Sequence, residues 1–378
     1  MEPLRVFVIA GEASGDQIGA DLIARLKTHT PLEVAGVGGK AMAGQGLRSL
    51  FPIADLSVMG VVDVLARLPF LLWRLYQCLR AVLKFDPDIV VLIDSQEFSH
   101  LLARRLRKRG FSKPILLYVA PTVWVYKPER AAKIRDLYDE VLAILPFEPS
   151  LMSKLGGPDT SFVGHPALPE GSVLNDGREK KYVALLPGSR VGELKRHLKM
   201  FGEVAGKIHQ NHPELEFFVP TLDYLEGYLG ASSAKWGVPV RIVADRVERD
   251  ALYQQTKIAL VVSGTATLEL AFSGVPMVVT YVMDAAQARV RRRLDIKHIS
   301  LPNIILDESL VPELLLEKPD EEALFAEAQK LLNYPQTAQK QIKGFVRMTK
   351  KMRSGMADFP RQDPGERVLF HAGQASTK

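Results

Sequence analysis

Residues 5–16 read RVFVIAGEASGD, and this stretch decides the fold. The apolar run Val6–Ala10 is typical of a strand that is buried within a sheet, and we expect the strand at Arg5–Ala10. The strand leads through the glycine turn Gly11–Asp16 into a helical pattern over Gly15–Thr28. A buried strand followed by a turn and a helix is the first half of a βαβ unit. We therefore expect an α/β protein with parallel sheets.

Outward from this stretch, short β-branched runs alternate with helical patterns such as Ser99–Arg109. The further strands expected in the first half lie at Glu33–Val37, Ile89–Ile93, Ile115–Val119, Val141–Ile144 and Ser161–Val163. A polar break at Pro169–Lys181, with six charged residues, is typical of a linker. The alternation then resumes, with strands expected at Tyr182–Leu186, Glu216–Val219, Val240–Val243, Ile258–Val262 and Met277–Tyr281.

Two successive α/β halves of domain size predict two doubly wound, Rossmann-like domains that face a cleft. We place an N-terminal domain at residues 1–168 and a second domain at residues 180–345. Residues 346–378 then form a C-terminal helical tail, and packing of this tail back on the N-terminal domain is one arrangement that we consider. Sheets of this kind bind ligands beyond the carboxyl ends of their strands.

The composition is that of a globular protein with a sizeable core, since 47% of the 378 residues are hydrophobic and 24% are charged. The net charge of +6 is compatible with an anionic substrate or membrane surface and is too small to argue for nucleic acid. The single cysteine, Cys78, cannot form an internal disulfide. Neither a secretory signal nor an apolar run of about 20 residues is found, so we expect a soluble or peripheral protein.

Glycine turns follow the first two expected strands. Gly11–Asp16 and Gly36–Gly39 both permit close approach of a ligand to the backbone, at the edge where the strands end. The alternative for the first turn is a tight connection capped by Ser14. Two such turns at one edge favour a ligand site there.

Asp94 directly follows the buried run Ile89–Ile93. A carboxylate at the carboxyl end of a buried strand faces the expected cleft and is a candidate general base. Capping of the next helix by Asp94 is the competing interpretation. Glu97 is the next candidate for the base. His165, in the segment GHP, is equally compatible with a structural and a catalytic role.

The second half repeats this arrangement. Arg190 follows Gly188 and Ser189 at the end of a strand, where its planar guanidinium suits a diphosphate, and a solvated arginine on a turn is the alternative. The run Ser263, Gly264, Thr265 follows another strand and lets a phosphate reach backbone amides. Glu269 lies one helical turn further, where it would accept hydrogen bonds from ribose hydroxyls, unless it is an ordinary surface charge.

Other catalytic motifs are missing from the sequence. It contains no Cys/His cluster or HExxH that would indicate a metal, no GxSxG of a serine hydrolase and no Walker A motif of an NTPase.

The segment Val61–Lys84 combines large apolar residues with interspersed arginines. This pattern is typical of an amphipathic helix at a membrane interface, although a core helix gives a similar pattern. The residues that we expect to face the membrane are Leu68, Phe70, Leu71, Leu72, Trp73 and Leu75. A second basic cluster, which favours an anionic lipid surface, comprises Arg289, Arg291, Arg292, Arg293 and Lys297.

Together these segments resemble the lipid-A-disaccharide synthases of Gram-negative bacteria. The matching segments are collinear over nearly the whole chain: GEASGD, GVGGKAM, SVMGVVDVL, IDSQEF, YVAPTVW, ILPFE, VGHP, LLPGSRVGE, SGTATLELA, GVPMVV and ISLPNIIL. The resemblance implies a glycosyltransferase with the two-domain GT-B architecture and without a metal or other cofactor. It implies a reaction between UDP-2,3-diacylglucosamine and 2,3-diacylglucosamine 1-phosphate that gives a β-1′,6 disaccharide and UDP. The implied location is cytoplasmic, on the inner face of the inner membrane.

The resemblance also implies roles for particular residues. Asp94 matches the proposed catalytic aspartate. The residues implied on the acceptor or cleft side are Glu12, Ser14, Gly15 and Asn303. Those implied on the UDP-sugar side are Gly188, Ser189, Arg190, Glu193, Ser263, Gly264, Thr265 and Glu269.

Three segments depart from the family pattern. The usual IDAPDF is IDSQEF here, the usual WAW is Trp124-Val125-Tyr126, and the segment after Tyr281 lacks the typical Met-Lys-Pro. These departures leave open how the acceptor and its acyl chains are bound.

The sequence therefore predicts an inverting glycosyltransferase that makes lipid A disaccharide 1-phosphate, with UDP-diacylglucosamine, an acylated glucosamine 1-phosphate and an anionic membrane surface as partners. One alternative is another UDP-N-acetylglucosamine enzyme of the same fold, a transferase or a 2-epimerase. A second alternative is a membrane-surface binding protein without catalysis. The oligomeric state stays open, with a homodimer as one option.

Overall fold

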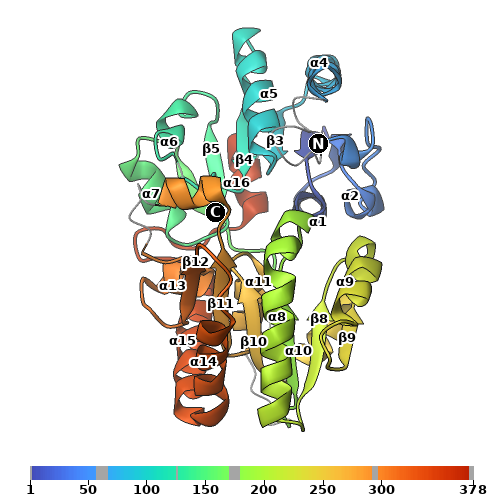
Figure 1. Cartoon of the computed structure of the whole chain (residues 1–378). Helices are drawn as coiled ribbons and strands as arrows, with labels where there is room; N and C mark the ends of the chain where they lie inside the picture. Colours follow the sequence, from blue (N-terminus) through green and yellow to red (C-terminus); the bar gives the residue numbers. More distant parts are fainter. Residues whose placement is uncertain (1, 57–66, 125–126, 170–178, 292–296, 374–378) are drawn as a thin grey trace. The chain divides into compact units, whose positions relative to one another are not determined.

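The computed structural model describes residues 2–56, 67–124, 127–169, 179–291 and 297–373. The chain divides into two compact units, one formed by residues 1–166 with 352–378 and the other by residues 167–351. Each unit contains one six-stranded parallel sheet with helices on its faces (Figure 1). The prediction of an α/β protein with two doubly wound sheets is confirmed.

The sheet of the first unit has the strand order β2-β1-β3-β4-β5-β6. Its strands are β1 (Leu4–Ala10), β2 (Leu32–Val37), β3 (Ile89–Ile93), β4 (Ile115–Tyr118), β5 (Glu140–Ala143) and β6 (Thr160–Phe162). The chain goes from β1 outward to β2 and then returns to the other side of β1 to form β3. The gap between the carboxyl ends of β1 and β3 is therefore the topological switch point, where open α/β sheets bind their ligands.

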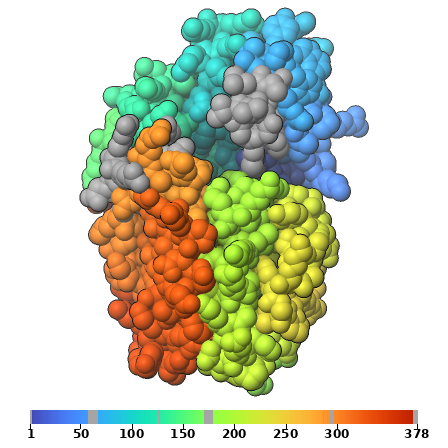
Figure 2. Space-filling model, in the orientation of Figure 1, coloured from blue at the N-terminus to red at the C-terminus, as the bar shows by residue number. Residues whose placement is uncertain are grey.

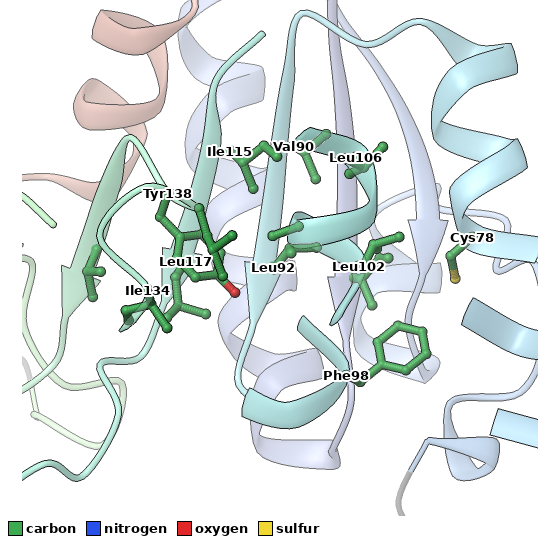
Figure 3. Packing of buried hydrophobic residues seen from close by; sticks show 14 of the residues in the cluster. Cys78, Val90, Leu92, Phe98, Leu102, Leu106, Ile115, Leu117, Ile134 and Tyr138 are labelled. Atoms are coloured by element: carbon green, nitrogen blue, oxygen red, sulfur yellow. The ribbon is translucent and has the colours of Figure 1, made fainter. Parts of the chain in front are cut away.

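Helices cover both faces of this sheet. They are α1 (Ala13–His29), α2 (Lys40–Gly44), α4 (Leu68–Phe85), α5 (Gln96–Lys108), α6 (Arg130–Lys133), α7 (Glu148–Lys154) and α16 (Pro364–His371), with a 3₁₀ turn at Ile53–Asp55. On one face, Val90 and Leu92 of β3 pack against Leu102 and Leu106 of α5 (Figure 3). Alternate residues of the same strand pack on the other face with Leu22 of α1. Strand β3 is apolar throughout its length because both of its faces are covered by helices.

The C-terminal segment packs on the edge of the first sheet. The Gln362 N–H donates a hydrogen bond of 2.8 Å to the Phe162 carbonyl of β6. On β5, the buried carboxylate of Glu140 accepts hydrogen bonds from Arg367 and His371 of α16 at 2.8–3.1 Å. These contacts place the segment from Met352 onward with the first unit.

The sheet of the second unit has the order β12-β11-β10-β7-β8-β9. Its strands are β7 (Tyr182–Leu186), β8 (Glu216–Pro220), β9 (Val240–Val243), β10 (Thr256–Val262), β11 (Met277–Val282) and β12 (Glu313–Leu316). Counted from the first strand of the unit, this is the order 3-2-1-4-5-6 of dinucleotide-binding sheets. The switch point lies between β7 and β10.

The helices of this unit are α8 (Val191–Asn211), α9 (Glu226–Ser233), α10 (Arg246–Tyr253), α11 (Ala266–Phe272), α12 (Ala285–Arg291), α13 (Leu301–Leu306), α14 (Glu321–Asn333) and α15 (Pro335–Ser354), with a 3₁₀ turn at Asp223–Leu225. Helix α8 contacts both α14 and α9, and Figure 2 shows these three helices side by side on one face. The apolar side of α8, which includes Phe201 and Val204, packs on the sheet.

Candidate active site

The switch point of the first sheet brings two predicted turns into contact. Ala10 and Ile93 are register partners at the ends of β1 and β3, so the residues that follow them lie side by side. A Cβ atom on Gly11 would lie 2.2 Å from the Cβ atom of Ser95, and one on Gly15 would lie 3.4 Å from the Ile93 side chain. The structure thus places the turn that carries Glu12, Ser14 and Gly15 directly beside the turn that carries Asp94.

Asp94 is held in an unusual backbone conformation. Its φ is +55° and that of Ser95 is +45°, in the left-handed region that residues other than glycine seldom adopt. The Asp94 N–H donates to the Tyr118 carbonyl of β4 at 3.0 Å, and the Ser99 hydroxyl donates to the Asp94 carbonyl at 2.9 Å. Such strain persists only where surrounding contacts fix the backbone, and it is concentrated at functional sites.

The Asp94 carboxylate has the electrostatics of a candidate base. Burial raises the pKa of Asp94 above its ordinary value, against a hydrogen bond of 2.9 Å that the carboxylate accepts from the Ser95 N–H. A raised pKa makes a carboxylate a stronger proton acceptor. Glu97, the next candidate, is 86% exposed and pairs with Arg130 at 2.7 Å, so its charge is already balanced by a partner on the surface.

The second glycine turn of the first unit has a structural explanation that the sequence did not reveal. The buried carboxylate of Asp16 accepts hydrogen bonds from the N–H groups of Gly39, Ala41 and Met42 at 2.7–3.1 Å. The Gly38 N–H donates to the Ser49 hydroxyl. These amides are therefore already used within the protein.

At the switch point of the second sheet, the β7–α8 turn presents Arg190. Gly188 has a φ of +123°, and a Cβ atom there would lie 2.8 Å from that of Glu193. Glu193 bonds Arg190 at 3.2 Å and accepts a hydrogen bond from the Ser189 N–H at 3.3 Å. The Arg190 side chain is 63% exposed, so Glu193 orients a guanidinium that stays open to a ligand. Glu193 thus contacts the turn that carries Arg190.

The β10–α11 turn lies on the other side of this switch point. The Ser263 hydroxyl donates to the Ile299 carbonyl at 2.6 Å, which anchors the start of the turn. Gly264, with a φ of +156°, and Thr265 are exposed, and the Cβ position of Gly264 is open space. Glu269 pairs with Arg249 of α10 at 3.3 Å.

Asn303, which the resemblance places on the acceptor side, has well-defined partners within the second unit. This side chain is 1% exposed, and its amide donates to the Val311 carbonyl at 2.9 Å. Its oxygen accepts hydrogen bonds from the Leu310 and Val311 N–H groups at 3.0 and 2.9 Å. All of its polar atoms are used to hold the segment after α13, so Asn303 stabilises the second unit.

The structure of helix α4 confirms the predicted amphipathic pattern, but one of the residues predicted on its exposed face is buried. Leu68, Phe70, Leu72 and Trp73 are 37–52% exposed, and Leu71 is half-buried. Leu75, however, is 1% exposed, so the prediction that it faces a membrane is wrong. It begins the core face of α4, whose members at i, i+3, i+4 and i+7 are Leu75, Cys78, Leu79 and Val82.

One arginine of α4 is part of the packing. The Arg74 guanidinium pairs with Asp55 at 2.5 Å and lies 4.3–5.0 Å from the ring centres of Phe51, Phe70 and Trp73. The ion pair with Asp55 joins α4 to the 3₁₀ turn, and the cation–π contact with Phe51 adds to this link.

Several predicted features fall outside the described residues. These are residues 61–66 of the amphipathic segment, Arg292 and Arg293 of the second basic cluster, and Val125 and Tyr126 of the WVY segment.

His165 is buried, and this burial lowers its pKa to about 4, which makes it neutral at physiological pH.

Two further features are absent from the part of the chain that the structure describes. No helix there is long and apolar enough to cross a membrane. No group of three or more His, Cys, Asp or Glu side chains among the same residues could hold a metal ion.

Two α/β units, each with a doubly wound six-stranded parallel sheet, define a GT-B protein. Solved structures agree with this class at the level of the fold. The S. aureus MnaA–UDP co-structure has a TM-score of 0.64 at 10% identity and covers 99% of this chain and 98% of its own. MurG of Acinetobacter baumannii has a TM-score of 0.55 at 13% identity, and the match covers 98% of this chain and 100% of the MurG chain.

The sequence comparisons define the family. The family model described as lipid-A-disaccharide synthetase matches residues 6–361. The lipid-A-disaccharide synthase of Rhodospirillum centenum is 39% identical over 374 residues, 95% of this chain and 92% of that protein. That of Nitrobacter winogradskyi is 38% identical over 362 residues, 93% and 91% respectively. The chain belongs to the lipid-A-disaccharide synthase family and is a glycosyltransferase of lipid A synthesis.

Proposed function

We propose that this glycosyltransferase joins UDP-2,3-diacylglucosamine to 2,3-diacylglucosamine 1-phosphate with inversion, giving lipid A disaccharide 1-phosphate and UDP. The observation that carries the proposal is the position of the predicted residues at both switch points. A buried, strained Asp94 lies at one, and the exposed Arg190 with the glycine turn at Gly264 lies at the other. The reaction itself is inferred from membership in the lipid-A-disaccharide synthase family, and the positions of these residues are consistent with it.

The second unit binds the donor in this proposal. The diphosphate contacts Arg190 and the backbone of Gly264 and Thr265, while Glu269 accepts hydrogen bonds from the ribose hydroxyls. Glu193 keeps Arg190 in place before the donor arrives. When the bond between the sugar C1 and the phosphate oxygen breaks, negative charge accumulates on the departing UDP, and preorganised positive groups stabilise that charge.

The first unit binds the acceptor and supplies the base. The acceptor 6-hydroxyl enters at the turns of Gly11 and Asp94, with Glu12 and Ser14 beside it. Asp94 takes the hydroxyl proton as the oxygen attacks C1 from the face opposite the diphosphate. The new β bond forms as the bond to UDP breaks, so the configuration at C1 inverts. Charge stabilisation is assigned to Arg190 and the glycine turn, and no metal or cofactor has a part in the proposed step.

The membrane surface supplies both acylated substrates in this proposal. The exposed apolar residues Leu68, Phe70, Leu72 and Trp73 of α4 insert among the lipids of the cytoplasmic leaflet of the inner membrane. An amphipathic helix with an aromatic side chain is suited to this depth. Attraction between the net charge of +6 and anionic lipids adds to the binding.

The test is an assay of UDP release from UDP-2,3-diacylglucosamine with and without the lipid acceptor. We expect release only when both are present, and a product with the mass of the acylated disaccharide phosphate. A 2-epimerase would instead isomerise UDP-N-acetylglucosamine without an acceptor, and a silent binding protein would release no UDP. The S. aureus and A. baumannii neighbours share only the fold at 10–13% identity, so they do not favour either alternative.

A further inference from the structure

Gln96, two residues after Asp94, connects the ends of two strands. It is the first residue of α5, and its side-chain amide nitrogen donates a hydrogen bond of 3.1 Å to the Val119 carbonyl at the end of β4. The preceding carbonyl of β4, that of Tyr118, accepts from the Asp94 N–H. Two consecutive peptide groups of β4 therefore hold the turn that carries Asp94.

The backbone conformation of Val119 directs its carbonyl toward the Gln96 side chain. In a regular strand, the N–H and C=O of one residue point to the same neighbouring strand. The Val119 N–H bonds Leu142 on the β5 side, but its C=O bonds Gln96 on the β3 side. A φ of +80° makes this reversal, which is costly for a β-branched residue. The bond to Gln96 satisfies the carbonyl that the reversal turns out of the ladder.

The Gln96 amide has no second bond among the residues that the structure describes. Its oxygen is buried and lacks a hydrogen-bond partner there. Rotating the amide would not improve this, because it would place the oxygen against the Val119 carbonyl, an acceptor against an acceptor. The contribution of this side chain therefore lies in its one bond to Val119.

We propose that Gln96 is a positioning residue, which sets the Asp94 carboxylate for catalysis by tying the β3–α5 turn to Val119. This inference rests on the proposed function of Asp94 as the base. Gln96 itself does not contact the reacting atoms. Without its bond, the left-handed residues Asp94, Ser95 and Val119 lose a restraint that links the two turns. A displaced base is less effective, because proton transfer requires hydrogen-bond distance to the attacking hydroxyl.

The test is a double-mutant cycle measured by acceptor-dependent UDP release. Gln96→Met keeps the length of the side chain and removes the donor. Gln96→Glu keeps the shape and places an acceptor at the Val119 carbonyl. We expect kcat to fall about ten- to hundredfold in both, with KM and the UDP affinity changed little. Gln336→Met, an exposed glutamine in the first turn of α15, is the matched control and leaves kcat unchanged.

The decisive arm repeats Gln96→Met in the Asp94→Asn background. Because Gln96 acts through Asp94, we expect less than about a twofold further loss there. Wild-type turnover in both Gln96 variants would overturn the positioning role of Gln96 but not the proposed base. An equal loss of kcat from Gln96→Met in the wild-type and Asp94→Asn enzymes would have the same consequence. Full activity of Asp94→Asn would overturn the proposed base and with it the inference. A melting temperature within a few degrees of wild type for Gln96→Glu verifies that the fold is retained.

Discussion

A Cβ atom added to Gly11 would lie 2.2 Å from the Cβ atom of Ser95, so the side chain of Ser95 in the β3–α5 turn packs directly against Gly11 in the β1–α1 turn. Only glycine fits at this position. Because Ser95 follows Asp94, the contact transmits any change at Gly11 to the proposed base. The proposed acceptor site of the first unit is thus built from two turns that are far apart in the sequence and fixed against each other.

We therefore expect Gly11→Ala to displace the Asp94 turn. Overpacking of this kind costs about 1–3 kcal/mol of stability, and kcat should fall at least about tenfold. Gly44→Ala is the control, since no atom lies within 4 Å of a Cβ there. Thermal unfolding and UDP release measure the two effects. Wild-type turnover in the Gly11→Ala enzyme would show that the two turns are not coupled to catalysis.

Arg190→Ala should weaken UDP binding. A charge-assisted contact contributes about 1.5–3 kcal/mol, which corresponds to roughly ten- to hundredfold in affinity. Calorimetric titration with UDP measures this directly, and Lys195→Ala, an exposed charge on the same helix, is the control. Unchanged UDP affinity in a folded Arg190 variant would remove this residue from the donor site.

Glu148 makes the stability of the first unit pH-dependent. Burial raises its pKa from 4.5 to about 8, against hydrogen bonds from the Ile144 and Leu145 N–H groups. Between these pH values the folded state keeps a proton that the unfolded state has released, so the free energy of unfolding falls as pH rises. The loss amounts to at most about 1.4 kcal/mol for each pH unit.

Glu148→Gln cannot lose a proton and retains an acceptor oxygen. Its stability relative to wild type should therefore increase from pH 5 to pH 8 in urea unfolding. The exposed Glu226→Gln is the control and should follow wild type at both pH values. Parallel pH profiles for wild type and Glu148→Gln would show that Glu148 is ionised in the folded protein.

The exposed face of α4 should mediate vesicle binding. The double variant Leu72→Ser with Trp73→Ser removes two apolar side chains, each of which contributes about 1.5–3 kcal/mol when buried. We expect at least tenfold weaker co-sedimentation with anionic phospholipid vesicles and a melting temperature near that of wild type. Val346→Ser, which is 52% exposed like Trp73, is the control. Equal binding by the double variant would argue against a membrane role for this face.

Much of the fold can be predicted from the sequence, because strands buried on both faces are uniformly apolar. The bounds of β3, β7 and β9 equal those predicted, and other strands differ by one or two residues. Strand β12 (Glu313–Leu316) was not predicted. It is short and half-buried, and it begins at Glu313, whose carboxylate accepts hydrogen bonds from the Ile299 and Ser300 N–H groups. Its sequence, ELLL, lacks the β-branched residues that mark the other strands.

The candidate site could be located from the sequence, but the partners of its side chains could not. Asp94 and Arg190 follow buried strands, and this position alone predicts the ligand edge. The partners of Asn303, Leu310 and Val311, could not be predicted because they are defined only by the folded loop. Leu75 was misassigned because α4 has apolar residues on its core face and on its exposed face. The periodicity of such a helix does not distinguish the two faces.

The proposed role of Asp94 as the general base is tested by the turnover of Asp94→Asn in acceptor-dependent UDP release. Asparagine keeps the size and capping ability of aspartate but cannot accept the hydroxyl proton. We expect kcat to fall about 10²–10⁴-fold while the UDP affinity and melting temperature stay near those of wild type. Turnover within a few-fold of wild type would contradict the assignment of Asp94 as the general base.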